Sequence, residues 1–397
     1  MAKPQIRLKG FEGEWENVCF KDFSYPAGEK NRDNLPLESY SISNEFGFVP
    51  QNEQFEKGGT MANADKRMYY IVKPDSFAYN PARINVGSIG YDNLDKDVIV
   101  SSLYVIFKTD SETNNEWLNI WFKTPYFKRL VELYQEGGVR LYFFYDKLCA
   151  CHLNRPLLLE QKAIADYFKS LDSMLQSTTK KIESLKQMKS ACLVSMFPQA
   201  DETTPRVRFK GFEGEWKKES AGHLFITFNE RNRPDLPVLS ANQDIRGMAP
   251  RNDIGYHISH NRTNEVTYKV VRPGQFVIHL RSFQGGFAHS SFEGITSPAY
   301  TVFGFKNSCE HDDYFWKIIF MSKEFIKNLE TITYGIRDGK SISFSEFSEM
   351  KFLFPSKEEQ QCIASYFLCL DKQISLQEQR LEKLKQIKAA CLDKMFV

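Results

Sequence analysis

Two regions of the sequence gather side chains that could form paired hydrogen bonds with a flat polar ligand such as a nucleobase. An arginine offers two parallel donors, which suit guanine, and an Asn or Gln offers a donor and an acceptor, which suit adenine. The candidates in the first half are Lys66, Arg67, Asn80, Arg83, Asn85 and Ser88, and those in the second half are Arg246, Arg251, Arg281, Gln284 and Arg337. For each residue taken singly, a solvated surface role is at least as well supported as a base contact.

Catalytic motifs are not found in the sequence. His257 and His260 lie three residues apart but have no third ligand beside them, which favours a surface loop over a zinc site. Gly335-x3-Gly339-Lys340-Ser341 has one residue too few for a phosphate-binding loop. None of the eight cysteines forms a CxxC pair, so reduced core cysteines are expected. We therefore assign no catalytic residue, no metal and no cofactor to this chain.

The elements that must position these candidate side chains occur twice. Pro4–Trp15 (PQIRLKGFEGEW) returns as Pro205–Trp216 (PRVRFKGFEGEW), and Pro156–Phe197 returns 199 residues later as Pro355–Phe396. The chain is therefore a tandem duplication, in which Trp15 and Trp216 are expected to be core anchors. Aromatic and β-branched runs between the repeats alternate with turn residues, which predicts mixed α/β domains. The predicted divisions are a domain at 1–155, a helix at 156–198, a second domain at 199–354 and a second helix at 355–397.

Both repeated segments have the heptad spacing of a coiled coil, with apolar residues at alternating intervals of four and three. About 40 helical residues span roughly 60 Å, which is too long for the intervening domain to carry the chain back along the first helix. We therefore expect an antiparallel pair, in an α+β fold with pseudo-two-fold symmetry. The predicted seam consists of Ile164, Phe168, Leu171, Leu175, Ile182 and Leu185 in the first helix and Ile363, Phe367, Leu370, Ile374, Leu381 and Leu384 in the second.

Bulk composition allows two well-packed domains. The 397 residues are 42% hydrophobic and carry a formal net charge of +2, which by itself gives no indication of a nucleic-acid partner. No apolar run approaches the roughly 18 residues of a membrane span, and no signal segment precedes the first repeat. A cytoplasmic protein is expected.

The repeated motifs resemble those of the specificity subunit of type I restriction-modification systems. They are the arm Gly-Phe-Glu-Gly-x-Trp, the helix start Pro-x3-Glu-Gln-x2-Ile-Ala-x-Tyr-Phe-x2-Leu-Asp and the helix end Leu-Lys-Gln-x-Lys-x-Ala-Cys-Leu-x2-Met-Phe. The resemblance implies two target-recognition domains that each read one half of a split double-stranded DNA sequence, and a coiled coil that sets their spacing.

The resemblance also implies partners. The coiled coil would dock two copies of a modification subunit, which binds S-adenosylmethionine and methylates an adenine in each half-site. Restriction subunits that use ATP and Mg would join for cleavage, so these cofactors are expected on the partners.

Two other classes of function remain open at this stage. One is a non-catalytic scaffold whose two domains hold protein partners without recognising DNA. It differs from the first reading in predicting no salt-dependent DNA binding. The other is a self-contained methyltransferase or nuclease, which would require methyl transfer or cleavage by the purified chain alone.

Overall fold

The computed structural model describes residues 3–54, 65–199, 202–242, 247–251, 262–332 and 342–396. The chain divides into two compact units, which are unit 1 (Met1–Lys181 with Gln377–Val397) and unit 2 (Ile182–Leu376). Both boundaries between the units fall inside a long helix. Each unit therefore combines one mixed α/β domain, the first part of the helix that follows it and the last part of the other helix.

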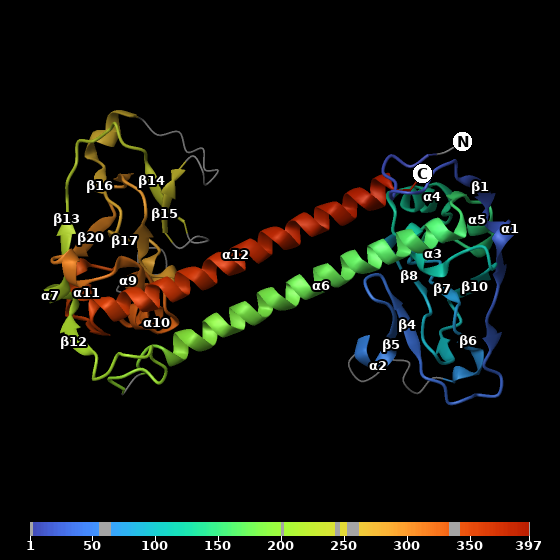
Figure 1. Ribbon diagram of the computed structural model, residues 1–397, viewed down its shortest axis with the longest axis horizontal. Coiled ribbons are helices and arrows are strands. Elements are labelled where there is room, and N and C mark those ends of the chain that lie inside the picture. Colours follow the sequence, from blue (N-terminus) through green and yellow to red (C-terminus); the bar gives the residue numbers. More distant parts are fainter. Residues whose placement is uncertain are drawn as a thin grey trace. The chain divides into compact units, whose positions relative to one another are not determined.

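Unit 1 contains a four-stranded sheet in the order β2-β10-β7-β8, a three-stranded sheet in the order β3-β6-β9, and the pairs β1-β11 and β4-β5 (Figure 1). Its strands are β1 (Glu16–Cys19), β2 (Ser24–Pro26), β3 (Glu29–Lys30), β4 (Tyr40–Ser43), β5 (Gly47–Pro50), β6 (Tyr70–Val72), β7 (Phe77–Tyr79), β8 (Ile89–Tyr91), β9 (Val98–Val100), β10 (Val105–Thr109) and β11 (His152–Arg155). Its helices are α1 (Phe20–Phe23), α2 (Gln51–Gln54), η2 (Lys66–Met68), η3 (Ile84–Val86), α3 (Asn115–Trp121), α4 (Pro125–Tyr134), α5 (Tyr145–Cys149) and the first part of α6 (Leu158–Ser195).

Unit 2 repeats this plan with a six-stranded sheet in the order β13-β20-β17-β18-β15-β14 and the pairs β12-β21 and β16-β19. Its strands are β12 (Lys217–Ser220), β13 (Phe225–Phe228), β14 (Leu239–Asn242), β15 (Gly247–Pro250), β16 (Lys269–Val271), β17 (Phe276–Ile278), β18 (Ala288–Ser290), β19 (Gly294–Thr296), β20 (Thr301–Phe305) and β21 (Lys351–Phe354). Its helices are α7 (Ala221–Leu224), η5 (Arg262–Thr267), α8 (Ser282–Gly285), η6 (Ser308–Glu310), α9 (Asp313–Phe320), α10 (Lys323–Ile332), α11 (Phe344–Glu349) and the first part of α12 (Lys357–Lys394).

The main core of each unit forms where aromatic side chains of the sheet meet the short helices after it. In unit 1, Phe77 of β7 stacks on Phe107 of β10 with ring centroids 5.0 Å apart, and the fully buried Trp117 and Trp121 of α3 belong to the same cluster. Asn114 is the N-cap of α3, and its side chain accepts a hydrogen bond from the Trp117 amide. The cap thus fixes the helix that delivers both tryptophans to the core.

Helices α6 and α12 lie antiparallel within unit 1. The Phe168 ring of α6 lies 6.1 Å from the Phe396 ring that follows α12, and Asp172, one turn further along α6, forms an ion pair with Lys388. As the residue number rises on one helix it falls on the other. The Ile6 amide also donates to the Lys394 carbonyl at 3.0 Å, so the N-terminal arm, which is the repeated segment Pro4–Trp15, binds the end of α12.

The same antiparallel contacts recur within unit 2. There the Phe367 ring of α12 lies 6.3 Å from the Phe197 ring that follows α6, and Asp371 forms an ion pair with Lys189. The second arm binds the end of α6 through a hydrogen bond of 2.9 Å from the Val207 amide to the Ser195 carbonyl. Each unit is thus built from equivalent parts of the duplicated chain.

The side chains chosen as the seam lie mainly on the covered faces of α6 and α12. Leu175 and Leu381 are half-buried. The buried members are Ile164, Phe168, Leu171, Ile182 and Leu185 on α6 and Ile363, Phe367, Leu370, Ile374 and Leu384 on α12. No helix in the described part of the chain is long and apolar enough to cross a membrane.

Candidate nucleic-acid interface

The first candidate loop of each unit connects two antiparallel strands at equivalent places in the fold. In unit 1 the loop runs from β7 to β8, whose register pairs Phe77 with Tyr91. In unit 2 it runs from β17 to β18, whose register pairs Phe276 with His289. Because both strand pairs lie in the main sheet of their unit, the two loops are held by the same scaffold.

Two of the candidate arginines occupy equivalent positions in these loops. Arg83 is the N-cap of the short helical turn η3, and Arg281 is the N-cap of the short helix α8. Each turn ends at a glycine with positive φ, Gly87 at 88° and Gly286 at 80°, a conformation that favours glycine. Both arginine side chains are exposed. A guanidinium is therefore presented at the same point of both units.

The remaining polar residues of the β7–β8 loop in unit 1 differ in whether their side chains are free to contact a ligand. Asn85 is exposed, whereas the side-chain oxygen of the half-buried Asn80 accepts a hydrogen bond from the Ala82 amide at 3.0 Å. Ser88 is 4% exposed, and its hydroxyl donates to the Ile42 carbonyl at 2.9 Å. Arg83 and Asn85 are thus the outward-facing members of this set.

In unit 2, candidates that are far apart in the sequence lie near the β17–β18 loop. Burial raises the pKa of the Tyr300 hydroxyl, and the nearby charges of Arg251 and Arg281 partly oppose that rise. Burial also lowers the pKa of His279 to about 4, so its imidazole is neutral at neutral pH. Arg251 is half-buried, and its Nε donates to the Ser240 hydroxyl at 3.2 Å, whereas Gln284 is exposed. The charges of Arg251 and Arg281 are thus both near enough to act on the Tyr300 hydroxyl.

The other candidates lie outside these loops. Lys66 and Arg67 belong to η2, where Arg67 Nε lies 3.2 Å from an Asp65 carboxylate oxygen and both side chains of this pair are largely exposed. Arg246 and Arg337 lie outside the described residues. A DNA contact by any of these candidates stays a prediction.

A buried ion pair missed by the sequence analysis anchors the arm of unit 1 to α6. Arg7 donates from Nε and Nη2 to the two carboxylate oxygens of Glu160, each at 2.8 Å, and the Glu160 side chain is only 2% exposed. The Glu160 carboxylate also raises the pKa of Arg7. Arg7 further donates to the carbonyls of Glu12 and Gly13, so one guanidinium joins the arm's turn to the helix.

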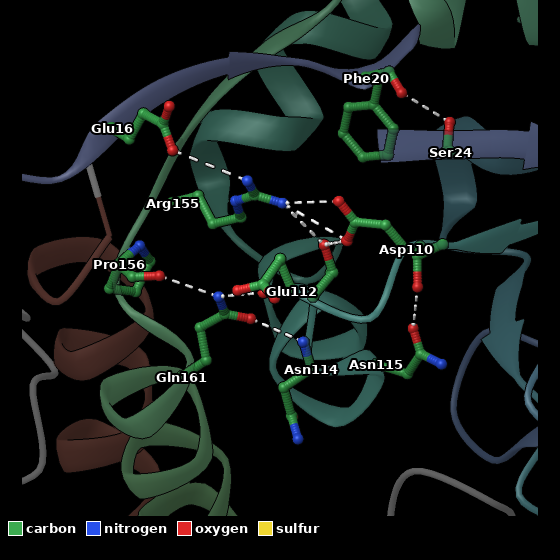
Figure 2. A network of polar contacts seen from close by, with 12 residues as sticks. Glu16, Phe20, Ser24, Asp110, Glu112, Asn114, Asn115, Arg155, Pro156 and Gln161 are labelled. Atoms are coloured by element: carbon green, nitrogen blue, oxygen red, sulfur yellow. Dashed lines mark hydrogen bonds and ion pairs between the residues drawn. The ribbon is translucent and has the colours of Figure 1, made fainter. Parts of the chain in front are cut away.

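The next residue of α6, Gln161, joins the helix to the domain. Its amide nitrogen donates to the carbonyls of Glu112 and Pro156 at 3.0 and 2.9 Å, and its oxygen accepts from the Asn114 amide at 2.7 Å (Figure 2). Gln161 is fully buried, so all three partners fix the start of α6 against the beginning of α3. The Glu-Gln pair of the repeated helix motif therefore has a positioning role.

Unit 2 repeats both anchors. Arg208 donates to the two carboxylate oxygens of Glu359 at 2.7 Å each, and the Glu359 side chain is 1% exposed. Gln360 accepts from the Asp312 amide at 3.0 Å and donates to the Pro355 carbonyl at 2.9 Å. The signal available in the sequence was the recurrence of Arg, Glu and Gln at matching positions of the repeats.

One position beside these anchors differs between the units. Arg155 of β11 binds Asp110 at 3.2 Å and lies 3.7 Å from Glu16 (Figure 2). The matching residue before the second helix is Phe354, whose ring lies 5.3 Å from that of His311. The same junction is thus polar in unit 1 and aromatic in unit 2.

The geometry offers recognition groups on loops and positioning groups at helix starts. Within the described ranges, no group of three or more His, Cys, Asp or Glu side chains is placed to hold a metal ion. What the loops present is a set of hydrogen-bond donors and acceptors on fixed strand pairs, which is the arrangement of a binding surface.

Comparisons with known proteins identify a family domain in the second half of the chain and a fold for the whole of it. Residues 217–386 match the model of the type I restriction modification DNA specificity domain. No curated protein sequence matches the chain significantly. Among solved structures, the HsdS subunit from Thermoanaerobacter tengcongensis matches with a TM-score of 0.51 at 15% identity, with 96% of each chain covered.

A second solved structure resembles the chain over nearly its whole length. The type I restriction-modification S subunit from M. genitalium matches with a TM-score of 0.55 at 12% identity, covering 100% of this chain and 99% of that one. These structural likenesses concern the fold, and the matched domain model concerns the family. Residues 217–386 thus match the type I restriction modification DNA specificity domain, and the chain as a whole has the fold of the two S subunits.

Proposed function

We propose that unit 1 and unit 2 each read one half of a split double-stranded DNA target. The observation that carries the proposal is the equivalent placement of Arg83 and Arg281 as exposed N-caps of loop turns on repeated strand pairs. An arginine in the major groove discriminates guanine by two hydrogen bonds. The side chains beside the two arginines differ, so the two units would read different half-sites.

The chain would act through partner subunits. Paired α6 and α12 would set the unread spacing between half-sites and dock two modification subunits, which bind S-adenosylmethionine and methylate adenine. Restriction subunits with ATP and Mg would join for cleavage. With a net charge of only +2, much of the grip on the DNA phosphates would come from these partners. A role on chromosomal DNA also supports the expected cytoplasmic location.

Methylation mapping tests this function. The chain would be co-expressed with its cognate modification subunit in a host without DNA methylation, and modified adenines would be mapped by single-molecule sequencing. We expect a split motif with two short specified halves and a fixed gap. A stable complex that adds no methylation would contradict sequence-directed modification and favour a scaffold that holds protein partners.

Matched variants assign the half-sites. Arg83→Ala should relax one half of the motif and Arg281→Ala the other, because a good bidentate base contact contributes about 1–3 kcal/mol of discrimination. Methylation at sites that differ from the target in one half would be compared between the two variants. Equal weakening of both halves by either variant would reassign that arginine to phosphate contact or to folding.

A further inference from the structure

A hairpin in unit 1 presents a rigid tip that none of the roles above uses. Glu136 and Tyr142 pair across it through both backbone hydrogen bonds, at 2.9 and 2.8 Å. Gly137 has φ of 137°, and a Cβ there would lie 2.1 Å from the Arg140 carbonyl oxygen. Only glycine therefore fits this turn, which fixes the position of the residues at the tip.

The tip combines exposed apolar side chains with an exposed charge. Val139 is fully exposed, Leu141 is 42% exposed, and Arg140 between them is also exposed. At the base, the Tyr142 and Phe144 rings stack with centroids 5.4 Å apart and planes within 2°. Such a group on a stiff hairpin has the composition of a surface that binds a charged partner with an apolar face.

The hairpin is tied to the loop that carries Arg83. The Phe143 amide donates to the Pro81 carbonyl at 3.0 Å, and the Phe143 side chain is fully buried. Helix α4, which leads into the hairpin, also contacts the η3 turn that Arg83 caps. The base of the hairpin and the proposed reading loop are therefore joined directly in unit 1.

The tip sequence recurs in the second half of the chain, although the loops otherwise diverge. Gly138-Val139-Arg140 stands 18 residues before Pro156, and Gly335-Ile336-Arg337 stands 20 residues before Pro355. The recurrence of glycine, a β-branched residue and arginine indicates a task common to both halves. A contact with the phosphate backbone would be such a task, because the backbone is the same whatever sequence each unit reads.

We propose that this hairpin tip is a second DNA contact of unit 1, beside the base pairs read by the Arg83 loop. The Arg140 guanidinium binds a backbone phosphate, and Val139 packs against the adjoining sugar edge and shields that contact from water. This inference rests on the proposed DNA-reading function. It adds a contact that is independent of base sequence, whereas Arg83 discriminates bases.

The test uses the full chain in complex with its modification subunit and a fluorescent duplex carrying the mapped target. Arg140→Ala should weaken binding to target and non-target duplexes by the same factor, about 3- to 10-fold, and reduce the slope of log affinity against log salt by about one. Arg140→Lys should keep most of the affinity, because a lysine also binds phosphate. Arg129→Ala, which removes an exposed arginine of α4 outside the hairpin, is the matched control and should change neither quantity.

The outcomes are distinct. Unchanged affinity and salt slope in Arg140→Ala would overturn the proposal, and so would a loss confined to one base sequence. Loss of the modification subunit from Arg140→Ala on size-exclusion chromatography would overturn it in favour of a protein contact. If the unaltered complex neither binds nor methylates a split target, the proposed function itself fails, irrespective of Arg140.

Discussion

Removing the Phe396 ring should destabilise unit 1, although this residue is separated from the N-terminal domain by almost the whole sequence. Phe396 is 6% exposed and contacts three aromatic rings of unit 1. Its centroid lies 6.5 Å from that of Trp15, 6.3 Å from that of Trp117 and 6.1 Å from that of Phe168. The substitution Phe396→Ala would leave a cavity where these three segments meet.

The expected cost is about 3 kcal/mol. Replacing a buried Phe by Ala costs about 3–5 kcal/mol, and the lower end applies because residues just beyond a helix end can partly collapse into the space. For a unit of this size, about 3 kcal/mol corresponds to a decrease in melting temperature of roughly 6–12 °C. That is a large fraction of the stability of a typical domain, which is about 5–15 kcal/mol.

Hydrogen exchange read by mass spectrometry locates the effect. In Phe396→Ala, amide protection should fall in β1 and α3 of unit 1 and remain in β12 and α9 of unit 2. The matched control is Phe197→Ala, whose ring contacts Trp216 at 5.9 Å and Phe315 at 5.7 Å in unit 2. It should produce the reverse pattern. Equal loss in both units from either variant, or no loss in unit 1 from Phe396→Ala, would refute the assignment of each helix end to one core.

Three further predictions follow from buried groups. Glu160→Ala leaves the Arg7 guanidinium without its partner and should lower the free energy of unfolding of unit 1 by about 2–4 kcal/mol, measured by denaturant titration, whereas an unchanged midpoint would argue against the clamp. Burial raises the pKa of Asp92 to about 6, above its unfolded value near 4, so the folded state binds the extra proton between these values and its stability falls as pH rises from 4 to 6. Asp92→Asn should remove this pH dependence, so that it stabilises the protein more at pH 8 than at pH 4, by up to about 2 kcal/mol. Melting temperatures measured at both pH values test this, and equal shifts at the two would contradict the assignment. Leu384→Asp places a charge at a buried position of α12 and should abolish co-purification of the modification subunit, and intact assembly would count against the paired-helix reading.

The long helices were the most predictable part of the fold. Their apolar spacing is regular over many turns, and the two copies report the same pattern independently. The structure has them at Leu158–Ser195 and Lys357–Lys394, close to the expected bounds. The spacing identifies which face of a helix is buried but not which residues pack against that face. The pairing of Phe396 with Trp15 could not be read from it, because both residues lie beyond the helix ends.

The candidate loops were predictable in location but not in side-chain direction. Composition alone selected Ser88 together with Arg83, yet the Ser88 side chain is buried and that of Arg83 is exposed. The equivalence of Arg83 and Arg281 was hidden as well, since the residues around them differ and only the paired strands reveal that each caps the same turn. Loop conformation depends on these tertiary contacts rather than on local propensity.

The hydrogen bond between arm and helix end has a different consequence for synthesis in the two units. In unit 2 it joins Val207 to Ser195, which leave the ribosome almost together, whereas in unit 1 it joins Ile6 to Lys394. Unit 2 is also one continuous stretch, from Ile182 to Leu376. The core of unit 1 is therefore completed only after all of unit 2 has been translated. Until then the nascent N-terminal domain is the part of the chain most exposed to proteases and chaperones.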